Sequence, residues 1–505
     1  MRSLLATVML GLGLLSVMPA QAQKSADTLR VAWRDRIADV DPYYNSLRTG
    51  LVLSQQVWDG LVFRDPASST LKPLLATAWR WVDPTTLELT LRPNVTFHNG
   101  DKFTAADVVY TVGIVTDPQA GLAVPAQFDW LAGAEAVDAL TVRLKLWRPF
   151  PAALDYLAAI LPIYPQAYRS RVGHAGFSRA PIGTGPYRFT KQDPQGLIEL
   201  ERYPGYYDGG GKGRALIGHV TIRQVADATA EIDALLAGQA DWIWQFNPEL
   251  YDAIAREAAV TALRQDSLRI AQITFNVARG PAASPLADLR VRQAVIHAIN
   301  RQAFIRQFSR NPAKVPDAPC HPAQFGCDPT AAKHYDYDPD KARGLLATAG
   351  YPNGFDIDVV STGISLAWGT AIQDDLMAVG IRARIVNLAP DAALARVEAG
   401  DVGLFLSAFG ASSIADVAAT LPYFFGGGPD DMARDALVEA AIHEGGATVD
   451  PLARKLAYAR AIRRVTEQAY TLPLATLQTV YGVSRTLDVK PYPDEMPRFF
   501  WMKWK

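Results

Sequence analysis

The stretch FHNGDKFTAADVVYTV, residues 97–112, gathers side chains that can hold a metal ion or transfer protons. It contains His98, Asp101, Thr104 and Asp107, together with an asparagine. Imidazole and carboxylate groups are common metal ligands and common general acids and bases. A metal or catalytic site is therefore one interpretation of this stretch.

Local backbone signals favour a structural role for the same residues. Asn99-Gly100 is typical of a tight turn. Thr104 is placed to cap a helix, and Asp107, three residues later, completes a capping box. The preceding segment TLELTLRPNVTF alternates apolar and polar residues as a strand does. We therefore predict a strand, a turn and a capped helix, with His98 at the surface of the turn.

No other group of residues forms a recognisable catalytic motif. The seven histidines show neither His-x-x-x-His nor Glu-x-x-His spacing, and Gly-x-Ser-x-Gly and Gly-x-Gly-x-x-Gly motifs are missing. The segment GGGKG at 209–213 lacks the Ser or Thr of a phosphate-binding loop, so we predict a flexible surface loop. We expect no enzyme activity, no cofactor and no metal site.

Length and composition describe a multi-lobed soluble protein. A chain of 505 residues exceeds what one hydrophobic core usually supports, so two or three lobes are expected. Hydrophobic residues make up 49% and charged residues 20% of the chain, as in globular proteins. The formal net charge of −1 provides no general attraction for nucleic acid or anionic membranes.

Residues 1–22 have the pattern of a secretory signal peptide. Arg2 precedes a short apolar run, and AQA at 20–22 offers small residues for cleavage after Ala22. A membrane anchor is the alternative, but the run is shorter than the ~20 residues that a membrane span needs. We expect an exported periplasmic protein with no membrane span after signal cleavage.

The chain has two cysteines, Cys320 and Cys327, in the segment CHPAQFGC. In an oxidising compartment, two cysteines this close in sequence predict a disulfide. The alternative is a metal site completed by His321. That site is disfavoured because the spacing is loose for zinc and no second pair of ligands lies nearby.

Two segments share the same order of predicted elements. VTIRQVADATAEIDALLAGQADWIW and IRARIVNLAPDAALARVEAGDVGLFL each run strand, helix, glycine turn and strand. Because they lie more than a hundred residues apart, they indicate two α/β lobes. Between them, the apolar spacing predicts one long amphipathic helix at 288–308 and another at 338–351, which ends at Gly350.

Together with further stretches, these segments resemble the family 5 extracellular solute-binding proteins of ABC transporters, the dipeptide-, oligopeptide- and nickel-binding type. The matching stretches keep the family's order over nearly the whole mature chain; they are VWDGLV, FHNGDKFTAADVVYTV, PIGTGPYRF, IDALLAGQADWIW, ITFNV, DLRVRQAVIHAINRQAFI, DPDKARGLLATAGY and DLMAVGIRARI. The resemblance implies an α/β, two-lobed periplasmic-binding-protein fold (type II, cluster C) with an extra domain inserted in the first lobe. It implies a first lobe at 23–49, 181–270 and 473–505, an inserted domain at 50–180 and a second lobe at 271–472.

The resemblance also implies a function. Members of the family capture a peptide or peptide-like solute between two lobes and deliver it to the permease subunits of an ABC importer. The alternatives are a receptor for a non-peptide ligand such as chelated nickel or an opine-like solute, an exported enzyme, and a chaperone or chemoreceptor protein. We expect a monomer that does not bind nucleic acid.

The residues that anchor the ligand depart from the pattern of the peptide-binding members. In those members a Trp and an Asp follow the last strand of the second lobe, and the Asp holds the peptide's α-amino group. By position, Phe409 replaces the Trp and Ser412 replaces the Asp, which leaves Asp416 as the nearby acid. The region that carries an Arg for the ligand carboxylate in dipeptide binders reads STGISLAWG, without an Arg. The candidate ligand-binding residues are Tyr43, Tyr44, Phe409, Ser412, Ser413 and Asp416.

Overall fold

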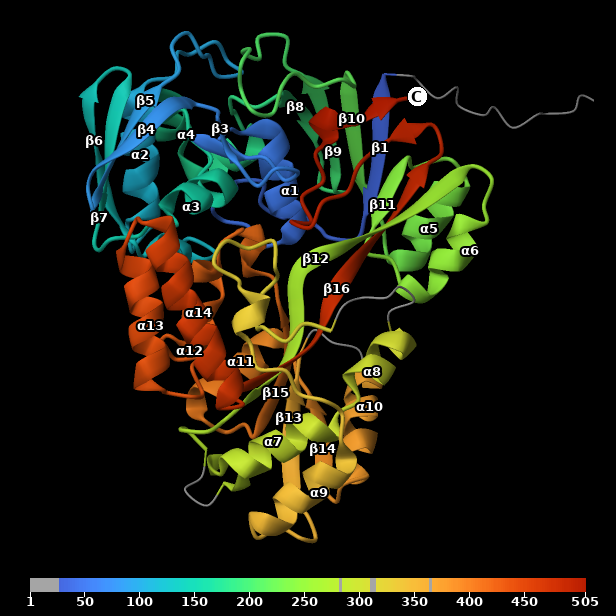
Figure 1. Ribbon diagram of the computed structural model, residues 1–505. Coiled ribbons are helices and arrows are strands. Elements are labelled where there is room, and N and C mark those ends of the chain that lie inside the picture. The colour runs from blue at the N-terminus through green and yellow to red at the C-terminus, as the bar shows by residue number, and fades with distance from the viewer. Residues whose placement is uncertain (1–26, 281–283, 309–314, 363–365) are drawn as a thin grey trace, which may run out of the picture.

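In the computed structural model, one ten-stranded β-sheet runs through both lobes of the molecule (Figure 1). In sheet order its strands are β14 (Arg382–Asn387), β13 (Asp356–Ser361), β15 (Leu404–Phe409), β12 (Val260–Phe275), β16 (Thr471–Ser484), β11 (Trp242–Trp244), β1 (Thr28–Trp33), β10 (His219–Gln224), β9 (Leu197–Arg202) and β8 (Tyr187–Gln192). The structure describes residues 27–280, 284–308, 315–362 and 366–505, so the predicted signal peptide lies outside it. Within these ranges, no helix combines the length and the apolar character that crossing a membrane requires.

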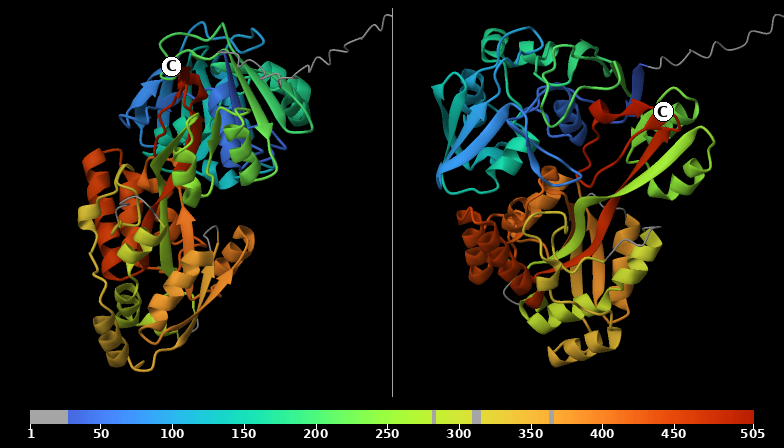
Figure 2. Two further views of the ribbon diagram at one scale, coloured as in Figure 1. Left: turned by 90° about the vertical axis from the view of Figure 1, so that its right-hand side faces the viewer. Right: turned by 45° about the horizontal axis from the view of Figure 1, so that its top comes forward.

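The two longest strands, β12 and β16, connect the lobes. They pair antiparallel in the middle of the sheet, with β11 on the first-lobe side and β15 on the second-lobe side. Figures 1 and 2 show them as one long ribbon pair that passes from the upper lobe into the lower one. Their register shifts between Asp266 and Ile270. An interrupted strand ladder between two lobes is suited to a hinge.

The first lobe is an α/β layer around β1. Its helices are α1 (Arg48–Val57), α5 (Ala228–Leu236) and α6 (Tyr251–Ala255). Strand β1 pairs in parallel with both β10 and β11. The first predicted strand-helix-strand unit is confirmed as β10, α5 and β11. The carboxylate of Asp227 caps α5 by accepting a hydrogen bond from the backbone N–H of Ala230 at 2.9 Å.

A separate antiparallel sheet lies beside the first lobe (Figure 1). Its strands, in sheet order, are β4 (Ala76–Asp83), β5 (Thr86–Leu91), β7 (Thr141–Leu146) and β6 (Leu131–Asp138), and the same part of the chain forms β2 (Val62–Arg64), β3 (Leu71–Pro73), α2 (Ala105–Val115), α3 (Ala153–Ile160) and α4 (Gln166–Arg179). One continuous hydrophobic core joins it to the first lobe, as Leu89 of β5 and Val31 of β1 illustrate. These elements fall within the segment expected for the inserted domain, whose exact boundaries stay a prediction.

The second lobe combines β13, β14 and β15 with a set of helices. Its helices are α7 (Leu289–Ala298), α8 (Arg301–Phe308), α9 (Pro339–Thr348), α10 (Leu366–Met377), α11 (Pro390–Ala399), α12 (Leu421–Phe425), α13 (Ala436–Ala447) and α14 (Pro451–Glu467). The second predicted strand-helix-strand unit is confirmed as β14, α11 and β15. Near the C-terminus, β17 (Leu487–Asp488) pairs with β18 (Lys503–Trp504).

The prediction of one helix over residues 288–308 is wrong, because α7 and α8 are separate helices. The backbone is extended at Ile299, and the side chain of Asn300 accepts a hydrogen bond from the N–H of Ala303 at 2.8 Å. Asn300 therefore caps the start of α8. The apolar spacing continues through this break, so periodicity alone does not reveal it.

The stretch at 97–112 is confirmed as a turn and a capped helix. The capping box of α2 is present, and the Asp107 carboxylate accepts the backbone N–H of Thr104 at 2.8 Å. His98, however, is half-buried rather than at the surface. Its Nε2 donates to the carbonyl of Gly185 at 3.0 Å, and its Nδ1 accepts from the N–H of Gly183 at 3.2 Å. Burial lowers the pKa of His98 to about 4, which keeps the imidazole neutral in this role.

The prediction of a flexible surface loop at 209–213 is also wrong for its lysine. Lys212 is buried, with its Nζ 2.9 Å from a carboxylate oxygen of Asp59. The same ammonium donates to the carbonyl oxygens of Gln55 and Trp58, both at 2.7 Å. A buried ammonium is tolerated only when it is paired and hydrogen-bonded, as here. Lys212 thus fixes this segment against the end of α1.

Candidate ligand-binding site

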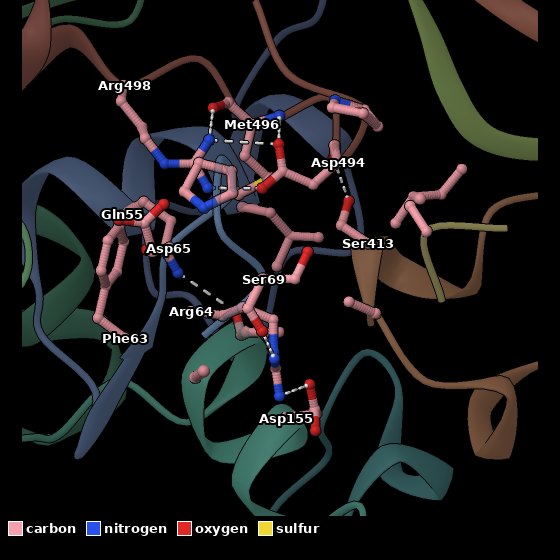
Figure 3. Close-up of a pocket in the computed structure, with 18 residues that line it drawn as sticks. Gln55, Phe63, Arg64, Asp65, Ser69, Asp155, Ser413, Asp494, Met496 and Arg498 are labelled. Atoms are coloured by element: carbon pink, nitrogen blue, oxygen red, sulfur yellow. Dashed lines mark hydrogen bonds and ion pairs between the residues drawn. The ribbon is translucent and has the colours of Figure 1, made fainter. Parts of the chain in front are cut away.

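A cavity with an empty volume of about 760 Å³, open mouth included, lies between the two lobes. Its wall includes Gln55 of α1, Arg64 and Asp155 of the inserted segment, Leu268 of β12, Ser413 of the second lobe and Asp494 of the C-terminal segment. Figure 3 shows the side chains of Gln55, Arg64, Asp155, Ser413 and Asp494 around one space. A cavity between two lobes, with mixed polar and apolar walls, suits a small solute.

Charged side chains in the wall are paired with one another. The guanidinium of Arg498 lies 2.5 and 3.2 Å from the two carboxylate oxygens of Asp494. The guanidinium of Arg64 contacts a carboxylate oxygen of Asp155 at another part of the wall (Figure 3). These pairs present polar atoms to a ligand without leaving one strong uncompensated charge in the wall.

Two carboxylates of the wall have opposite pKa shifts. Burial raises the pKa of Asp155 to about 6, against the opposing effect of Arg64, and the nearby Asp416 carboxylate raises it further. Burial also acts to raise the pKa of Asp65, but hydrogen bonds from Lys72 and the backbone outweigh it and lower that pKa to about 2. Of these two carboxylates, Asp155 is the one that gains a proton in mildly acidic solution.

Ser413 links the second lobe to the first across this cavity. Its hydroxyl accepts a hydrogen bond from the guanidinium of Arg48 on α1. It donates one to the backbone carbonyl of Asp494 (Figure 3). The backbone of Ser413 has φ of 67°, a left-handed conformation that is strained for a residue other than glycine. Such strain at a lobe contact is typical of a functional loop.

The C-terminal segment also fastens to the hinge strands. The Glu495 carboxylate lies 2.8 Å from the guanidinium of Arg269 on β12 and accepts a hydrogen bond from the hydroxyl of Thr479 on β16. The N–H of Leu268 donates to the carbonyl of Pro493 at 2.8 Å. The register shift of β12 thus lies against the cavity wall, so a rearrangement at the hinge changes the shape of the site.

The comparison with known proteins agrees with this geometry. A model of the bacterial extracellular solute-binding proteins, family 5 Middle, matches residues 70–431. The chain belongs to family 5 of the bacterial extracellular solute-binding proteins. It is 29% identical over 346 residues to the glutathione-binding protein GsiB of Pectobacterium atrosepticum. That alignment covers 68% of this chain and 65% of the relative, which is just under two thirds of its length.

Solved structures show the same fold. HbpA2 of Haemophilus parasuis superimposes with a TM-score of 0.84 at 23% identity, covering 95% of this chain and all of that one. A dipeptide-binding protein of Pseudoalteromonas sp. SM9913, in complex with Met-Leu, superimposes with a TM-score of 0.78 at 19% identity over 95% of this chain and 100% of that one. The expected two-lobed type II periplasmic-binding-protein fold is confirmed.

Among the predicted site residues of this family 5 protein, Ser413 lies in the cavity wall. Phe409, at the end of β15, is half-buried and stacks on Tyr423, with 4.6 Å between ring centroids and 14° between planes. Phe424 contacts its ring edge-on at 5.2 Å. The side chain of Ser412 lies outside the described part of the chain. Ligand contacts of Phe409 and Ser412 stay predictions.

The structure places the two predicted tyrosines of the first lobe away from the cavity wall. Tyr43 is 5% exposed and lies in the core shared with the inserted segment, where its hydroxyl donates to the carbonyl of Pro162 at 2.6 Å. Tyr44 stacks on the imidazole of His174, with 3.7 Å between ring centroids. Adjacent tyrosines thus serve packing and stacking here, and the sequence alone does not distinguish these roles from ligand binding.

Asp416 has a structural partner instead of a free carboxylate. It is fully buried, and its oxygens lie 2.8 and 3.0 Å from a guanidinium nitrogen of Arg454. It also accepts a hydrogen bond from the N–H of Ala418 at 2.8 Å. The suggestion that Asp416 supplies the acid for a ligand ammonium is therefore not supported by its geometry.

Cys320 and Cys327 form the predicted disulfide. The imidazole of His321 accepts a hydrogen bond from the N–H of Ala323 at 3.1 Å, within the loop that the disulfide closes. In the described ranges, no three His, Cys, Asp or Glu side chains gather as metal ligands would. The loop is thus organised by the disulfide and by local hydrogen bonds.

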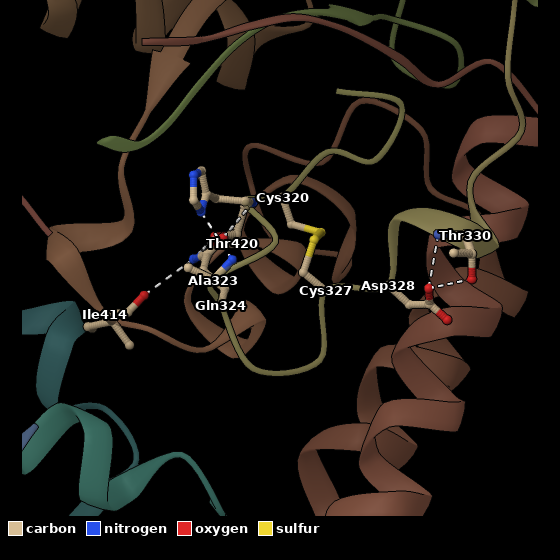
Figure 4. The surroundings of a disulfide bond; sticks show 9 residues. Cys320, Ala323, Gln324, Cys327, Asp328, Thr330, Ile414 and Thr420 are labelled. Atoms are coloured by element: carbon tan, nitrogen blue, oxygen red, sulfur yellow. Dashed lines mark hydrogen bonds between the residues drawn. A yellow bond between two sulfur atoms is a disulfide. The ribbon is translucent and has the colours of Figure 1, made fainter. Parts of the chain in front are cut away.

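The disulfide loop forms part of the second-lobe wall of the cleft. Ala323 lines the cavity, and the N–H of Phe325 donates to the carbonyl of Ala415, another wall residue, at 2.8 Å. The side chain of Gln324 donates to the carbonyl of Ile414 at 3.3 Å (Figure 4). These contacts tie the disulfide loop to the segment that follows β15, which is where the family resemblance places the ligand anchor.

Sequence reasoning missed the contributions of the inserted segment and the C-terminal segment to the site. Arg64 and Asp155 face the cavity from the inserted segment, and Asp494 and Arg498 face it from the C-terminal one. The one available signal is the charge-rich, proline-flanked segment PDEMPR at 493–498, which follows the last long strand. Charged residues flanked by prolines are common in surface loops. This segment is therefore recognised as part of a site only when the three-dimensional structure is known.

Proposed function

We propose that this family 5 protein is the exported ligand-binding component of an ABC importer, which captures a solute between its lobes and delivers it to permease subunits in the membrane. The observation that carries the proposal is the cavity walled by both lobes, the hinge strand β12 and the C-terminal segment. Closing two lobes over a solute shifts the protein toward a closed state that a permease can recognise. This function calls for a monomer in the periplasm and for no catalysis.

We propose a peptide or peptide-like ligand. The relative GsiB is named for glutathione binding, and the structural neighbour from Pseudoalteromonas holds the dipeptide Met-Leu. The wall of the cavity combines paired charged side chains with apolar ones. Such a wall suits a molecule that has amide groups, a positive group and a negative group. Because Ser412 stands where peptide binders carry an Asp, and Asp416 is paired with Arg454, unmodified dipeptides should bind weakly.

A ligand screen tests this proposal. The mature protein is heated with dialanine, trialanine, tetraalanine, pentaalanine or glutathione, and ligands that raise the melting temperature are measured by calorimetry. A ligand that binds only the folded state raises its stability in proportion to ln(1 + [L]/Kd). We expect glutathione or one of the longer peptides to bind with a micromolar or lower Kd. If all five leave the melting temperature unchanged, the peptide-like assignment is wrong.

A further inference from the structure

A second cavity adjoins the one described above. It has an empty volume of about 1150 Å³, open mouth included, and also lies between the lobes. The two cavities have five wall residues in common, namely Arg64, Ser69, Asp155, Ala323 and Ala415. They therefore form one continuous cleft, with an inner part beside the hinge and an outer part beside α14.

The outer cavity has walls of its own from both lobes. Trp81 of β4 lies on the side of the inserted segment, and Phe325 of the disulfide loop faces it together with Arg454 and Lys455 of α14. The guanidinium carbon of Arg454 lies 4.5 Å, and the Nζ of Lys455 5.5 Å, from the centroid of the Phe325 ring. Two cations thus gather beside one aromatic ring.

These two cations differ in how they are neutralised. Arg454 is buried and paired with Asp416 at 2.8 Å. Lys455 is exposed and, within the described ranges, forms no ion pair with another residue. The remaining charged residues of the outer wall, Arg64 and Asp155, are paired with each other. The outer cavity consequently carries one cation in excess, at Lys455.

In the inner cavity, carboxylates have partners of opposite charge. Asp494 is paired with Arg498, and Asp65 is paired with Lys72, which lies outside the wall. The inner part therefore offers no excess cation for an anionic group. A ligand that carries a carboxylate gains most by placing it in the outer part, where a charge-assisted hydrogen bond to an ammonium is available.

We propose that the outer cavity binds the carboxylate end of a peptide-like ligand longer than a dipeptide, with Lys455 as its charged contact. This inference rests on the proposed function and narrows it to elongated, carboxylate-terminated solutes. The body of the ligand lies in the inner cavity, and its chain passes the Arg64–Asp155 pair at the junction. Lys455 is then a specificity-determining residue that selects for length and for a free carboxylate.

Calorimetry of the full mature chain tests this inference with tetraalanine, its C-terminal amide and dialanine as probes. The variant is Lys455→Gln. Its matched control is Lys333→Gln, because Lys333 is also exposed, also lies beside a ring of the second lobe (Tyr335, at 4.8 Å) and lines neither cavity. We expect Lys455→Gln to weaken tetraalanine binding by about tenfold, as loss of a charge-assisted contact does, and to leave dialanine binding unchanged.

Amidation provides the second arm of the experiment. It should weaken tetraalanine binding to wild type by a similar factor and have no further effect on Lys455→Gln, since both changes remove the same interaction. If Lys455→Gln behaves like Lys333→Gln, or if the amide binds wild type as well as the acid does, the outer cavity does not hold the carboxylate. Failure of tetraalanine to bind wild type also overturns this inference, whereas binding of glutathione or dialanine in that case would leave the proposed function standing.

Discussion

Asp416 and Arg454 form a buried ion pair in the second lobe, with 2.8 Å between a carboxylate oxygen and a guanidinium nitrogen. Burial alone acts to lower the pKa of Arg454, but the Asp416 carboxylate outweighs it and holds that pKa above its ordinary value. The pair also lies beside Phe325 of the disulfide loop, over which the guanidinium stacks. It therefore fixes the second-lobe side of the cleft.

Substituting Asp416→Asn should lower the free energy of unfolding by about 3–5 kcal/mol, because it leaves the Arg454 guanidinium buried without a counter-charge. Urea denaturation measures the change. The control is Glu444→Gln, which breaks the exposed pair between Glu444 and Arg460 and should cost less than about 1 kcal/mol. Equal effects of the two substitutions would contradict the assignment of Asp416 to the structure of the lobe.

Several elements near the site could be predicted because their signals are local. The capping box of Thr104 and Asp107 lies within four residues of sequence, and its hydrogen bond forms as expected. The strand-helix-strand units β10-α5-β11 and β14-α11-β15 follow from patterns contained within each segment. Cys320 and Cys327 are close in sequence, so an oxidising compartment is enough to predict that they form a disulfide.

The composition of the cavity could not be predicted in the same way. From the sequence, Asp416 is expected to be an unpaired carboxylate near the ligand. Its partner, Arg454, lies on a helix that follows later in the chain, so the sequence does not reveal the ion pair. Arg64 and Asp494 reach the same cavity from segments at opposite ends of the sequence. The hydrophobic periodicity and the residue spacing of the sequence do not predict such contacts, because they depend on how β12 and β16 bring the lobes together.

Substituting Ser413→Ala should lower ligand affinity by about 30-fold, because it removes two hydrogen bonds that join the lobes and each is worth roughly 1 kcal/mol. The variant should also be more open without ligand, which small-angle scattering measures as a larger radius of gyration. Thr190→Ala is the control, since the hydroxyl of Thr190 donates to a carbonyl within the first lobe. Unchanged affinity and unchanged scattering in Ser413→Ala would show that the hydrogen bonds of Ser413 do not hold the two lobes together.

Removing the disulfide by Cys320→Ser together with Cys327→Ser should lower the free energy of unfolding by about 2–3 kcal/mol, as expected for closing so short a loop. It should also weaken ligand binding, because Ala323 of that loop lines the cavity. Denaturation and calorimetry, each with and without reductant, measure both effects. Reductant should change wild type but leave the double variant unchanged; an effect on the variant would point to another cause.

The raised pKa of Asp155 gives the protein a pH-dependent stability. The pKa of this carboxyl is 3.8 in the unfolded chain and about 6 in the folded protein. Between these pH values the folded state therefore binds more protons than the unfolded state. Its contribution to stability is therefore fully present below pH 3.8 and lost as the pH rises through about 6. The shift corresponds to about 3 kcal/mol across this window.

The test compares Asp155→Asn with wild type by urea denaturation at several pH values between 4 and 7. An asparagine does not titrate, so the free energy of unfolding of wild type, minus that of the variant, should fall as the pH rises. Asp65→Asn is the control in the same cavity wall, because the pKa of Asp65 is lowered to about 2 and this carboxyl stays ionised in the folded state throughout the range. The difference in free energy of unfolding between wild type and Asp65→Asn should be nearly constant above pH 5. A flat difference for Asp155→Asn as well would mean that Asp155 keeps an ordinary pKa in the folded protein, and that the Arg64 guanidinium compensates fully for its burial.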